Sequence, residues 1–347
     1  MKYILLYNIL PGLMTPLLGN GQEGFTHGCD VTECYIVNDL KQYNRPMDSY
    51  DAVIFNMNVL HNSGKLPWKE VNYSRKSNQR FVFFSQEPPM YTWGGSGQVD
   101  TNEVNLYVNY FNWSMSYRND ADVQLFYGAT KLKDNFNIIP LNNNKIKSTN
   151  QSIVVWMASH CQTDGRREDY VRELNRYISV DSYGNCGKIV EGCVKSASSG
   201  DSPEECYEMI ESKYKFYLSF ENSLCTDYVT EKFFQILNRN LVPVVYGAAD
   251  YNRIAPPNSY IDALQFNSPK DLANYLITLD GNDELYKKYF DWKDHYVVEA
   301  GQKQMVLNGF CNLCRKLHQD NKPKIYTKLL NDWLPENQCK PPSDILY

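Results

Sequence analysis

Residues 214–247, YKFYLSFENSLCTDYVTEKFFQILNRNLVPVVYG, combine a strand, a polar turn, a helix and a second strand. Residues 216–220 are apolar and aromatic, and residues 241–246 are short and rich in valine, as expected of strands buried in a parallel sheet. The polar turn at 221–223 connects the first strand to the helix. Because the start of a helix offers unpaired N–H groups and a positive dipole end, this arrangement predicts a phosphate site that suits a nucleotide.

The helix after this turn has one apolar face and one polar face. Its apolar residues recur at helical spacing and are expected to pack on the sheet; they are Val229, Phe233, Ile236 and Leu237. The other face carries Tyr228, Glu231, Lys232 and Gln235. Lys232 is suited to a phosphate and Glu231 to the hydroxyls of a sugar. An isolated Glu-Lys pair is usually a solvated surface pair, so the residues around it decide between the two interpretations.

With 347 residues, of which 43% are hydrophobic and 22% charged, the chain is expected to form two globular domains. The formal net charge of −5 and the lack of a dense Lys/Arg run argue against nucleic acid and anionic membranes as partners. No stretch approaches the roughly 20 apolar residues needed to span a bilayer. Residues 1–10 lack the basic region and cleavage site of a signal peptide, and residues 3–7 are expected to form the first strand.

Ten cysteines are many for a cytosolic enzyme of this size, and their even number and local clustering favour disulfides and the secretory pathway. Zinc is the alternative, because Cys311 and Cys314 have ligand spacing, but no matching second ligand pair is present. Pairing among four other cysteines would fix the irregular residues 184–206; these are Cys161, Cys186, Cys193 and Cys206. A lumenal protein is also consistent with the sequons at Asn72, Asn112 and Asn150.

The first half alternates short apolar runs with polar loops, which predicts the strands of one α/β domain. These runs are residues 3–7, 52–55, 81–84 and 106–110. Glu87 follows the third run, at the carboxyl end of its strand, where ligands of open α/β sheets gather. Pro88 and Pro89 stiffen the loop and hold this carboxylate in place. A loop carboxylate is most often structural, so Glu87 is a candidate that depends on its context.

The second half begins after residues 131–150, which are rich in Lys and Asn, lack apolar periodicity and are expected to be a linker. After it, strands are expected at 153–157 and 179–183. Three helices are also expected: one ends near residue 177, one starts at Ser268-Pro269 and one covers 283–292.

One set of residues carries a family resemblance. It comprises Tyr217, the turn 221–223, Asp227-Tyr228, Thr230-Glu231-Lys232 and residues 242–245. This set closely resembles the signature segment of the α1,3-fucosyltransferases, which are inverting enzymes that use GDP-fucose and adopt the GT-B fold. The resemblance implies an α/β protein with two Rossmann-like domains that face each other across a cleft. It places an acceptor-side domain that carries the catalytic base at 1–130, the linker at 131–150, a GDP-fucose-binding domain at 151–320 and a C-terminal tail or helix at 321–347.

The resemblance also implies a role for each candidate residue. Glu87 corresponds to the catalytic base, although this chain has Pro88 where the family's Glu-Ser-Pro motif has serine. Arg167 corresponds to the arginine that grips the diphosphate, with Arg166 as the neighbouring alternative, and Lys232 would stabilise the leaving GDP. The remaining residues contact the donor: Asn222, Tyr228 and Glu231 hold its fucose and ribose hydroxyls, and Tyr217 lines the nucleotide pocket.

No metal site and no cofactor are implied, with Mn²⁺ or Mg²⁺ acting at most as stimulating ions. The rival is Asp120-Ala-Asp122, because metal-dependent glycosyltransferases of the other major fold hold a nucleotide diphosphate with a D-x-D motif after a strand. Here the apolar run at 123–127 follows the motif, so we interpret it as a structural loop. The resemblance further implies that a C-terminal Cys-x-x-Cys bridges to cysteines near the first strand; these are Cys311 and Cys314, with Cys29 and Cys34.

Cys225 and the cysteine-bearing loop before it resemble invertebrate members that fucosylate the innermost GlcNAc of N-glycans. We therefore expect transfer to the 3-OH of a GlcNAc residue in the N-glycan core. The alternatives are a Lewis-type enzyme that acts on N-acetyllactosamine and a glycan-binding pseudoenzyme. The resemblance implies the Golgi lumen, where animal relatives are held by an N-terminal anchor. This sequence lacks that anchor, so the chain is expected to be either truncated or naturally without one.

Overall fold

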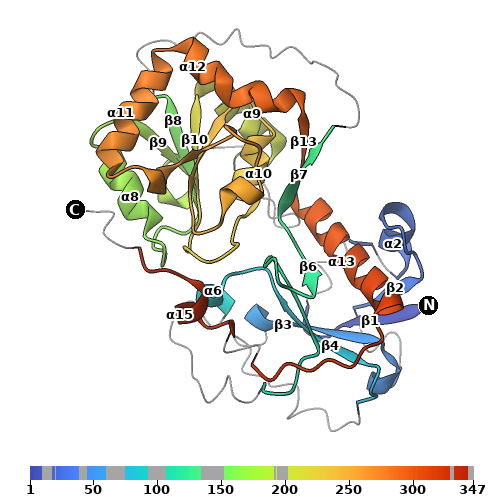
Figure 1. The fold of residues 1–347 in the computed structure, drawn as a ribbon. Helices are drawn as coiled ribbons and strands as arrows, with labels where there is room; N and C mark the ends of the chain where they lie inside the picture. The colour runs from blue at the N-terminus through green and yellow to red at the C-terminus, as the bar shows by residue number, and fades with distance from the viewer. Residues whose placement is uncertain are drawn as a thin grey trace. The chain divides into compact units, whose positions relative to one another are not determined.

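The computed structural model describes residues 1–9, 18, 19, 21–38, 45–59, 75–92, 107–133, 152–190, 193, 202–328 and 332–342. The chain divides into two compact units. The N-terminal unit comprises Met1–Phe126 and Gln302–Cys339, and the C-terminal unit comprises Tyr127–Gly301 and Lys340–Tyr347. Each unit is an α/β structure built on one main parallel sheet (Figure 1).

The sheet of the N-terminal unit has six parallel strands in the order β2-β1-β3-β4-β5-β6. These are β1 (Lys2–Leu6), β2 (Cys34–Val37), β3 (Ala52–Asn56), β4 (Arg80–Ser85), β5 (Trp113–Ser116) and β6 (Val123–Gln124). The helices are α2 (Glu23–Gly28), η1 (Met47–Ser49), α6 (Pro89–Thr92), α13 (Gln302–Gln319) and α15 (Pro335–Gln338). Strands β3 and β4 are buried along their whole length, which explains why their sequences are apolar runs without alternation.

The long helix α13 belongs to the N-terminal unit and not to the domain expected at 151–320. It packs against α2, β1 and β6. At Gly309 the helix lies so close to Leu125 that a Cβ at this position would come within 2.2 Å of Leu125 Cδ1. Two disulfides fasten the helix there, and they are the pairs that the family resemblance implies, Cys29–Cys311 and Cys34–Cys314.

The main sheet of the C-terminal unit has five parallel strands in the order β12-β11-β10-β8-β9. These are β8 (Val154–Met157), β9 (Val180–Tyr183), β10 (Phe216–Phe220), β11 (Val242–Tyr246) and β12 (Ile261–Asp262). The α-helices are α8 (Arg167–Leu174), α9 (Glu204–Lys213), α10 (Glu231–Leu237), α11 (Pro269–Asp280) and α12 (Asp283–Lys287). Short 3-10 helices are η2 (Gly184–Cys186), η3 (Tyr251–Arg253), η4 (Ala263–Gln265) and η5 (Lys288–Asp294).

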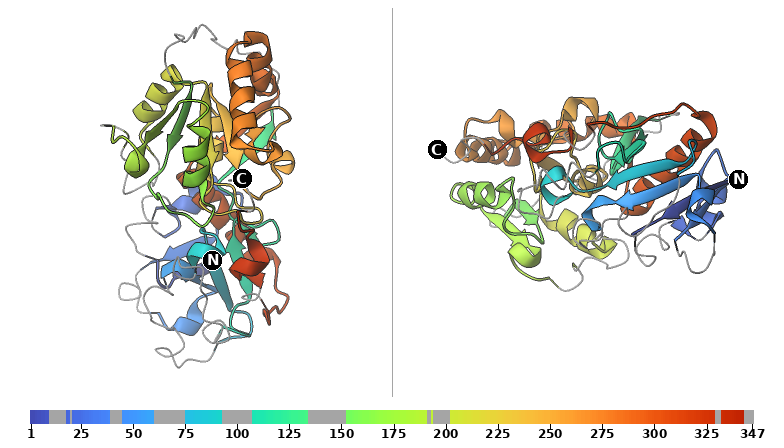
Figure 2. Two further views of the ribbon diagram at one scale, coloured as in Figure 1. Left: turned by 90° about the vertical axis from the view of Figure 1, so that its left-hand side faces the viewer. Right: turned by 90° about the horizontal axis from the view of Figure 1, so that it is seen from below.

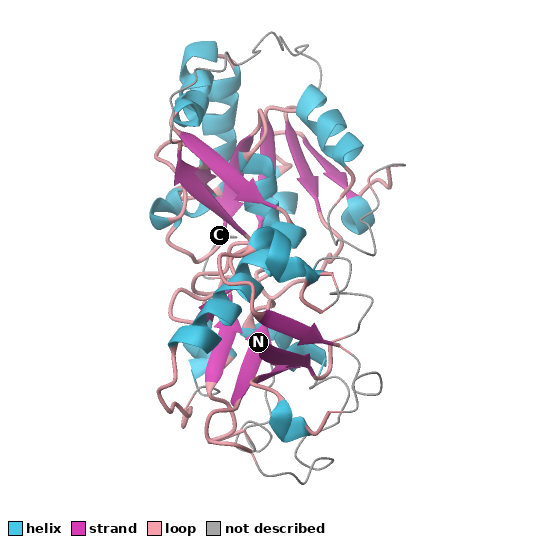
Figure 3. Ribbon diagram, turned by 90° about the vertical axis from the view of Figure 1, so that its right-hand side faces the viewer, coloured by secondary structure: helices cyan, strands magenta, loops and turns pink. Residues whose placement is uncertain are grey.

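Helices cover both faces of this sheet (Figures 1 and 2). Phe216, Leu218 and Phe220 of β10 point to one face and pack with α8 and α11. Tyr217 points to the opposite face and packs with α9 and α10. The alternation of side chains along β10 therefore produces the two helix layers, which Figure 3 shows by secondary structure.

The expected linker at 131–150 is partly a strand. Its first residues belong to β7 (Gly128–Leu132), which pairs antiparallel with β13 (Tyr296–Ala300). This pairing places β7 in the C-terminal unit, so the first domain ends at Phe126 and not at residue 130. Residues 134–150 lie outside the described part of the chain.

Two further local expectations need correction. Residues 107–110, expected as the end of a strand, form a turn in which Asn109 has a φ of 61°. The turn lets the Tyr107 ring stack on Phe111, with centroids 5.7 Å apart, so aromatic packing outweighs strand propensity here. Helix α9 begins at Glu204, inside the stretch expected to be irregular.

Within the part of the chain that the structure describes, no helix combines the length and apolar character needed to cross a membrane. The sequon at Asn112 is buried, with 6% of the residue exposed. Its amide donates to the Lys324 carbonyl at 2.7 Å and accepts from the Phe81 N–H at 2.8 Å. The folded chain cannot carry a glycan on such an amide. Asn72 and Asn150 lie outside the described residues.

Candidate functional site

The strand order of the C-terminal unit reverses between β8 and β10, because the chain continues from β8 to β9 on one side and from β10 to β11 on the other. In open α/β sheets, ligands bind beyond the carboxyl ends of the strands at this reversal. Two segments leave the sheet there: residues 158–166 after β8 and residues 221–230 after β10. These segments and the helices that follow them form the candidate site.

Arg167, the first residue of α8, connects the two segments. Its Nη1 donates to the Phe220 carbonyl at 2.8 Å, and its Nη2 donates to the His160 carbonyl at 3.2 Å. The residue is only 2% exposed, and its Nε has no hydrogen-bond partner in the part of the chain that the structure describes. Among the described residues, no carboxylate forms an ion pair with it. Because a buried cation without a counter-charge is unfavourable, this position is suited to an anionic ligand.

The loop before α8 is held by hydrogen bonds at both of its ends. Glu168 accepts from the N–H and the hydroxyl of Thr163, at 2.9 and 2.8 Å. The Gly165 N–H donates to the Asn222 carbonyl at 2.8 Å. A Cβ at Gly165 would lie 2.9 Å from that carbonyl oxygen, so the close approach of the two segments requires glycine.

The neighbouring arginine is placed differently. Arg166 precedes the helix with a φ of 49°, and its side chain is 52% exposed. It forms an ion pair with Asp169 at 2.7 Å, in which the Arg166 Nε is the donor. The start of the same loop is fastened by the disulfide Cys161–Cys186, and a second disulfide, Cys193–Cys206, holds the segment before α9. Of the two candidate arginines, the structure therefore places only Arg167 inside the strand reversal.

Glu221, Thr230 and Lys232 form a hydrogen-bonded group at the start of α10. Thr230 caps the helix and donates from its N–H and its hydroxyl to Glu221 Oε1, at 2.8 and 3.0 Å. Lys232 Nζ donates to the Thr230 hydroxyl oxygen at 2.9 Å and lies 3.5 Å from Glu221 Oε2. Complete burial raises the pKa of Glu221, and the Lys232 ammonium acts in the opposite direction.

The turn after β10 holds further polar atoms without partners. Asn222 Oδ1 and Ser223 Oγ are buried and have no hydrogen-bond partner within the described ranges of the chain. Buried polar atoms in folded proteins are nearly always satisfied, so these atoms indicate a place for a ligand or an ordered water. Together with Arg167 Nε, they line the same strand reversal.

The three other candidates in this unit have distinct surroundings. Tyr228 is 1% exposed and packs edge-on against Tyr127. The Glu231 side chain is 20% exposed, and its Oε1 lies 3.3 Å from Lys232 Nζ. Tyr217, which was expected to line the nucleotide pocket, lies in the core between β10, α9 and α10 and is 3% exposed. It also interacts electrostatically with Glu231 and Arg167, so its part in the nucleotide pocket stays a prediction.

Glu87 lies in the N-terminal unit, two residues beyond the end of β4. Its carbonyl accepts from the Ser85 hydroxyl at 2.8 Å and from the Thr92 hydroxyl at 3.1 Å. Pro89 then begins α6. These bonds fix the backbone that carries the Glu87 carboxylate.

The carboxylates of the Asp120-Ala-Asp122 loop are bound to cations of their own unit. Arg118 donates to both Asp120 oxygens, at 2.7 and 2.6 Å, and thereby lowers the pKa of Asp120. Asp122 accepts from Lys324 Nζ at 2.6 Å and from the Tyr326 hydroxyl at 2.5 Å. A divalent cation would have to displace these donors before it could bind.

One cluster among the described residues has the spacing of metal ligands, and it consists of Cys34, Cys314 and His318. Its two cysteines are joined in a disulfide, so they offer no thiolate to zinc.

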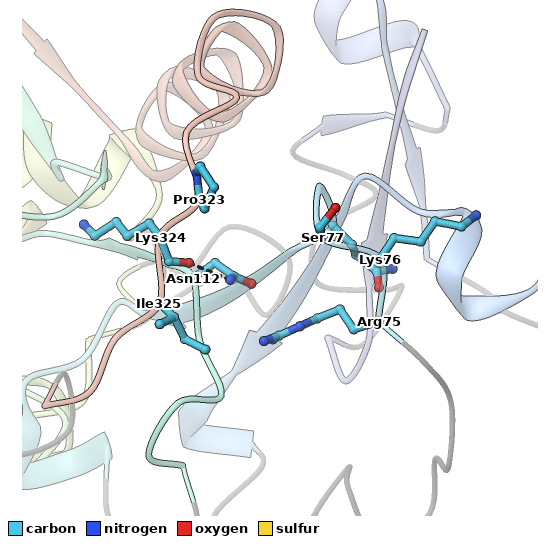
Figure 4. A pocket seen from close by; sticks show the side chains of 8 residues that line it. Arg75, Lys76, Ser77, Asn112, Pro323, Lys324 and Ile325 are labelled. Atoms are coloured by element: carbon cyan, nitrogen blue, oxygen red, sulfur yellow. Dashed lines mark hydrogen bonds between the residues drawn. The ribbon is translucent and has the colours of Figure 1, made fainter.

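A cavity of about 370 Å³ lies in the N-terminal unit at the amino ends of β4 and β5 (Figure 4). It is lined by Arg75, Lys76, Ser77, Gln79, Asn112, Pro323, Lys324 and Ile325. Figure 4 shows the Arg75 guanidinium extending toward Ile325 and the Lys76 and Lys324 side chains extending outward. This edge of the sheet is opposite to the one that carries Glu87, so the cavity is separate from the candidate base.

Three residues of the site were not assigned a role from the sequence: Gly165, Glu221 and Thr230. Thr230 carries a detectable signal, because a threonine directly before a helical pattern is a typical N-cap. No local pattern gives Glu221 or Gly165 a role, because their importance arises from contacts between segments that are distant in the chain.

Comparison with known proteins agrees with this arrangement. Residues 147–333 match the family model described as Glycosyltransferase family 10 (fucosyltransferase) C-term, and residues 1–128 match the model described as Fucosyltransferase, N-terminal. The α-(1,3)-fucosyltransferase C of Drosophila melanogaster is 34% identical over 332 residues, which are 90% of this chain and 71% of that protein. The glycoprotein 3-α-L-fucosyltransferase A of the same organism is 40% identical over 234 residues, 64% of this chain and 42% of that protein.

A crystal structure of an α1,3-fucosyltransferase with GDP-fucose has the same fold, with a TM-score of 0.52 over 93% of this chain and 91% of that chain at 13% identity. The expected α/β class, with two Rossmann-like units of the GT-B type, is thereby confirmed. The two family models together extend over both units of the structure. The chain therefore belongs to glycosyltransferase family 10 and is an α1,3-fucosyltransferase.

Proposed function

We propose that this enzyme uses GDP-fucose as its donor and transfers fucose, with inversion, to the 3-OH of a GlcNAc residue in the core of an N-glycan. The observation that carries the donor assignment is the buried Arg167 guanidinium, which has no carboxylate partner among the described residues and lies at the strand reversal. A nucleoside diphosphate supplies the missing negative charge, and a planar guanidinium matches two phosphate oxygens at once.

Inversion requires attack on the anomeric carbon from the face opposite to the diphosphate. We assign Glu87 as the base that takes the proton from the acceptor hydroxyl while the new C–O bond forms. The bond between the anomeric carbon and the phosphate oxygen breaks, and GDP leaves with the electron pair. Arg167 and Lys232 oppose the charge that grows on the leaving phosphate, so two side chains supply what a divalent ion supplies in other transferases.

The hydroxyls of the donor have partners in the same segment. Asn222 Oδ1 is a buried acceptor without a partner and is suited to a sugar hydroxyl. Glu231 lies beside Lys232, so one carboxylate faces hydroxyls while the adjacent ammonium faces phosphate. We assign the buried Tyr228, with Asn222 and Glu231, to the fucose and ribose hydroxyls of the donor.

The acceptor and the compartment are proposed from different observations. The identity with a glycoprotein 3-α-L-fucosyltransferase favours an acceptor on a glycoprotein. All ten cysteines of the chain are disulfide-bonded, which is typical of proteins that fold in an oxidising compartment. We therefore propose that the reaction takes place in the Golgi lumen.

An acceptor panel with GDP-fucose as donor tests the proposal. The purified chain is incubated with an N-glycan core, with N-acetyllactosamine or without acceptor, GDP release is measured, and the linkage in the product is determined by NMR. We expect rapid GDP release only with the N-glycan core, and an α1,3 linkage to its innermost GlcNAc. Faster transfer to N-acetyllactosamine would identify a Lewis-type enzyme. Binding of glycans without any transfer would identify a pseudoenzyme.

A further inference from the structure

Glu221 is the only Asp or Glu side chain that is fully buried among the residues that the structure describes. Burying an isolated carboxylate is costly, so its partners must compensate the charge. These partners are close: the Thr230 N–H and hydroxyl contact Oε1, the hydroxyl also lies 3.0 Å from Oε2, and Lys232 Nζ lies 3.5 Å from Oε2. In this state, Glu221 and Thr230 together fix the position of the Lys232 ammonium.

The four charged side chains closest to this group balance one another before a ligand arrives. Arg167 and Lys232 contribute two positive charges, and Glu221 and Glu231 contribute two negative ones. The diphosphate of GDP-fucose adds about two negative charges at neutral pH. If all four side chains stayed ionised, they and the diphosphate would have a net charge of about −2. This charge would lie in a region of low dielectric constant, where like charges repel strongly.

Lys232 cannot fully neutralise both the Glu221 carboxylate and the diphosphate. When its ammonium turns to a phosphate oxygen, the Glu221 carboxylate keeps only the hydrogen bonds from Thr230 and becomes a buried anion without a cation. A buried carboxyl in this situation is stabilised by binding a proton. The Thr230 hydroxyl is suited to the change, because it can accept from a protonated carboxyl where it donated to the carboxylate before.

We propose that Glu221 is a positioning residue for Lys232 and takes up one proton from solvent when the diphosphate of GDP-fucose binds. The inference rests on the proposed donor. It means that donor binding and proton uptake are one linked step. Glu221 does not touch the reacting atoms.

The groups that face Glu221 are consistent with this change. Burial raises the pKa of Glu221, Lys232 lowers it, and Glu231 on the same helix raises it again. Tyr251 of η3 also interacts with Glu221: burial, and next the Glu221 carboxylate, raise the pKa of this phenol. The Arg167 guanidinium donates to the carbonyl of Phe220, the residue before Glu221. Withdrawing Lys232 therefore removes the largest influence that keeps the carboxyl ionised.

Isothermal titration calorimetry of GDP-fucose into the enzyme, without acceptor, tests the proposal. GDP-fucose is the probe because its diphosphate is esterified at both ends and does not titrate near neutral pH, whereas the terminal phosphate of GDP does. Titrations in buffers of different ionisation enthalpy count the protons exchanged. The expected uptake is about one proton per bound donor, with affinity falling by up to about tenfold per pH unit as pH rises.

Glu221→Gln should bind GDP-fucose with no proton uptake and with an affinity that hardly changes with pH. Asp169→Asn, which removes a carboxylate of the same unit that pairs with Arg166 and Arg172, should keep the uptake of the unchanged enzyme. Glu231→Gln should also keep it, and loss of uptake in this variant would place the proton on Glu231 and overturn the proposal. Loss of uptake in the Glu231 variant would overturn the proposal even if Glu221→Gln failed to fold.

The possible failures are distinguishable. Binding of GDP-fucose without proton uptake would overturn the role of Glu221 and leave the proposed donor intact. No binding of GDP-fucose at all would overturn the proposed donor, and this inference with it.

Discussion

Arg166 and Arg167 are adjacent in the sequence, and only one of them is placed to meet a ligand. Arg166 precedes α8 and pairs with Asp169 at the surface, whereas Arg167 lies one helical step further and turns inward to the Phe220 carbonyl. Arg166 has a left-handed backbone, with a φ of 49°, and Arg167 is the first helical residue, so the change of backbone conformation sends the two side chains in different directions. The backbone hydrogen bonds of the guanidinium then aim its remaining donors.

Arg167→Lys should weaken binding of GDP-fucose by roughly 10- to 100-fold, because an ammonium cannot bond two carbonyls and a phosphate in one plane. The measurement is the Kd from calorimetry or the KM for the donor. Arg166→Lys is the matched control and should leave both values nearly unchanged. Equal losses in the two variants would show that Arg167 has no special part in donor binding.

Glu87→Gln should lower kcat by roughly 10²- to 10⁴-fold, the usual contribution of a general base, while the Kd for GDP-fucose stays within about twofold. Steady-state kinetics with the best acceptor of the panel gives the first value, and calorimetry gives the second. Glu33→Gln, an exposed carboxylate of the same unit, is the control. A variant that keeps its turnover would exclude Glu87 as the base.

The helix α10 depends on Thr230 at its first turn. The hydroxyl accepts from the Lys232 N–H as an N-cap and also donates to the buried Glu221. Thr230→Val keeps the shape but removes these two bonds and the one from Lys232 Nζ, so we expect the free energy of unfolding to fall by about 2 kcal/mol or more. Urea denaturation measures this change. Thr230→Ser keeps the hydroxyl and should retain most of the stability; if the serine variant lost as much, packing of the methyl group would be the cause.

The D-x-D loop between β5 and β6 is stabilised by its own ion pairs, and these define the expected response to chelation. Because Asp120 and Asp122 are held by Arg118, Lys324 and Tyr326, EDTA should leave transfer activity at or near its initial level. Asp122→Asn should instead lower the stability of the N-terminal unit, as measured by thermal denaturation, with little change in KM for GDP-fucose. Complete loss of activity in EDTA, restored by Mn²⁺, would revive the metal-dependent alternative.

At the scale of the whole molecule, two disulfides join residues that are 282 and 280 positions apart. Each bridge alone closes nearly the same long loop. Replacing either pair by serine should therefore cost about 2–3 kcal/mol, whereas replacing both should cost more than the sum of the two single losses. Denaturation curves of the two single-bridge variants and the double variant measure this. Simple additivity would contradict the shared-loop explanation.

The candidate site shows how far sequence reasoning reaches. Glu231 and Lys232 became candidates because a strand, a turn and a helix start follow one another within a short segment, and Asn222 because the family resemblance implies its role. The structure brings Arg167 to the same strand reversal, although it follows a different strand. Tyr217 lies in the same segment and is nevertheless enclosed in the core. Periodicity predicts that a strand alternates between two faces, but it does not say which helix covers each face.

The sequence by itself determined the strands β3, β4, β8, β10 and β11, the N-cap at Ser268 and the class of the fold, because these depend on apolar runs and caps within a few residues. Only the tertiary structure decided that α13 joins the N-terminal unit, that β7 is a strand and that Glu221 is buried. The physical reason is that local propensity acts between neighbours in the chain, whereas burial and ion pairing depend on segments that meet only after folding.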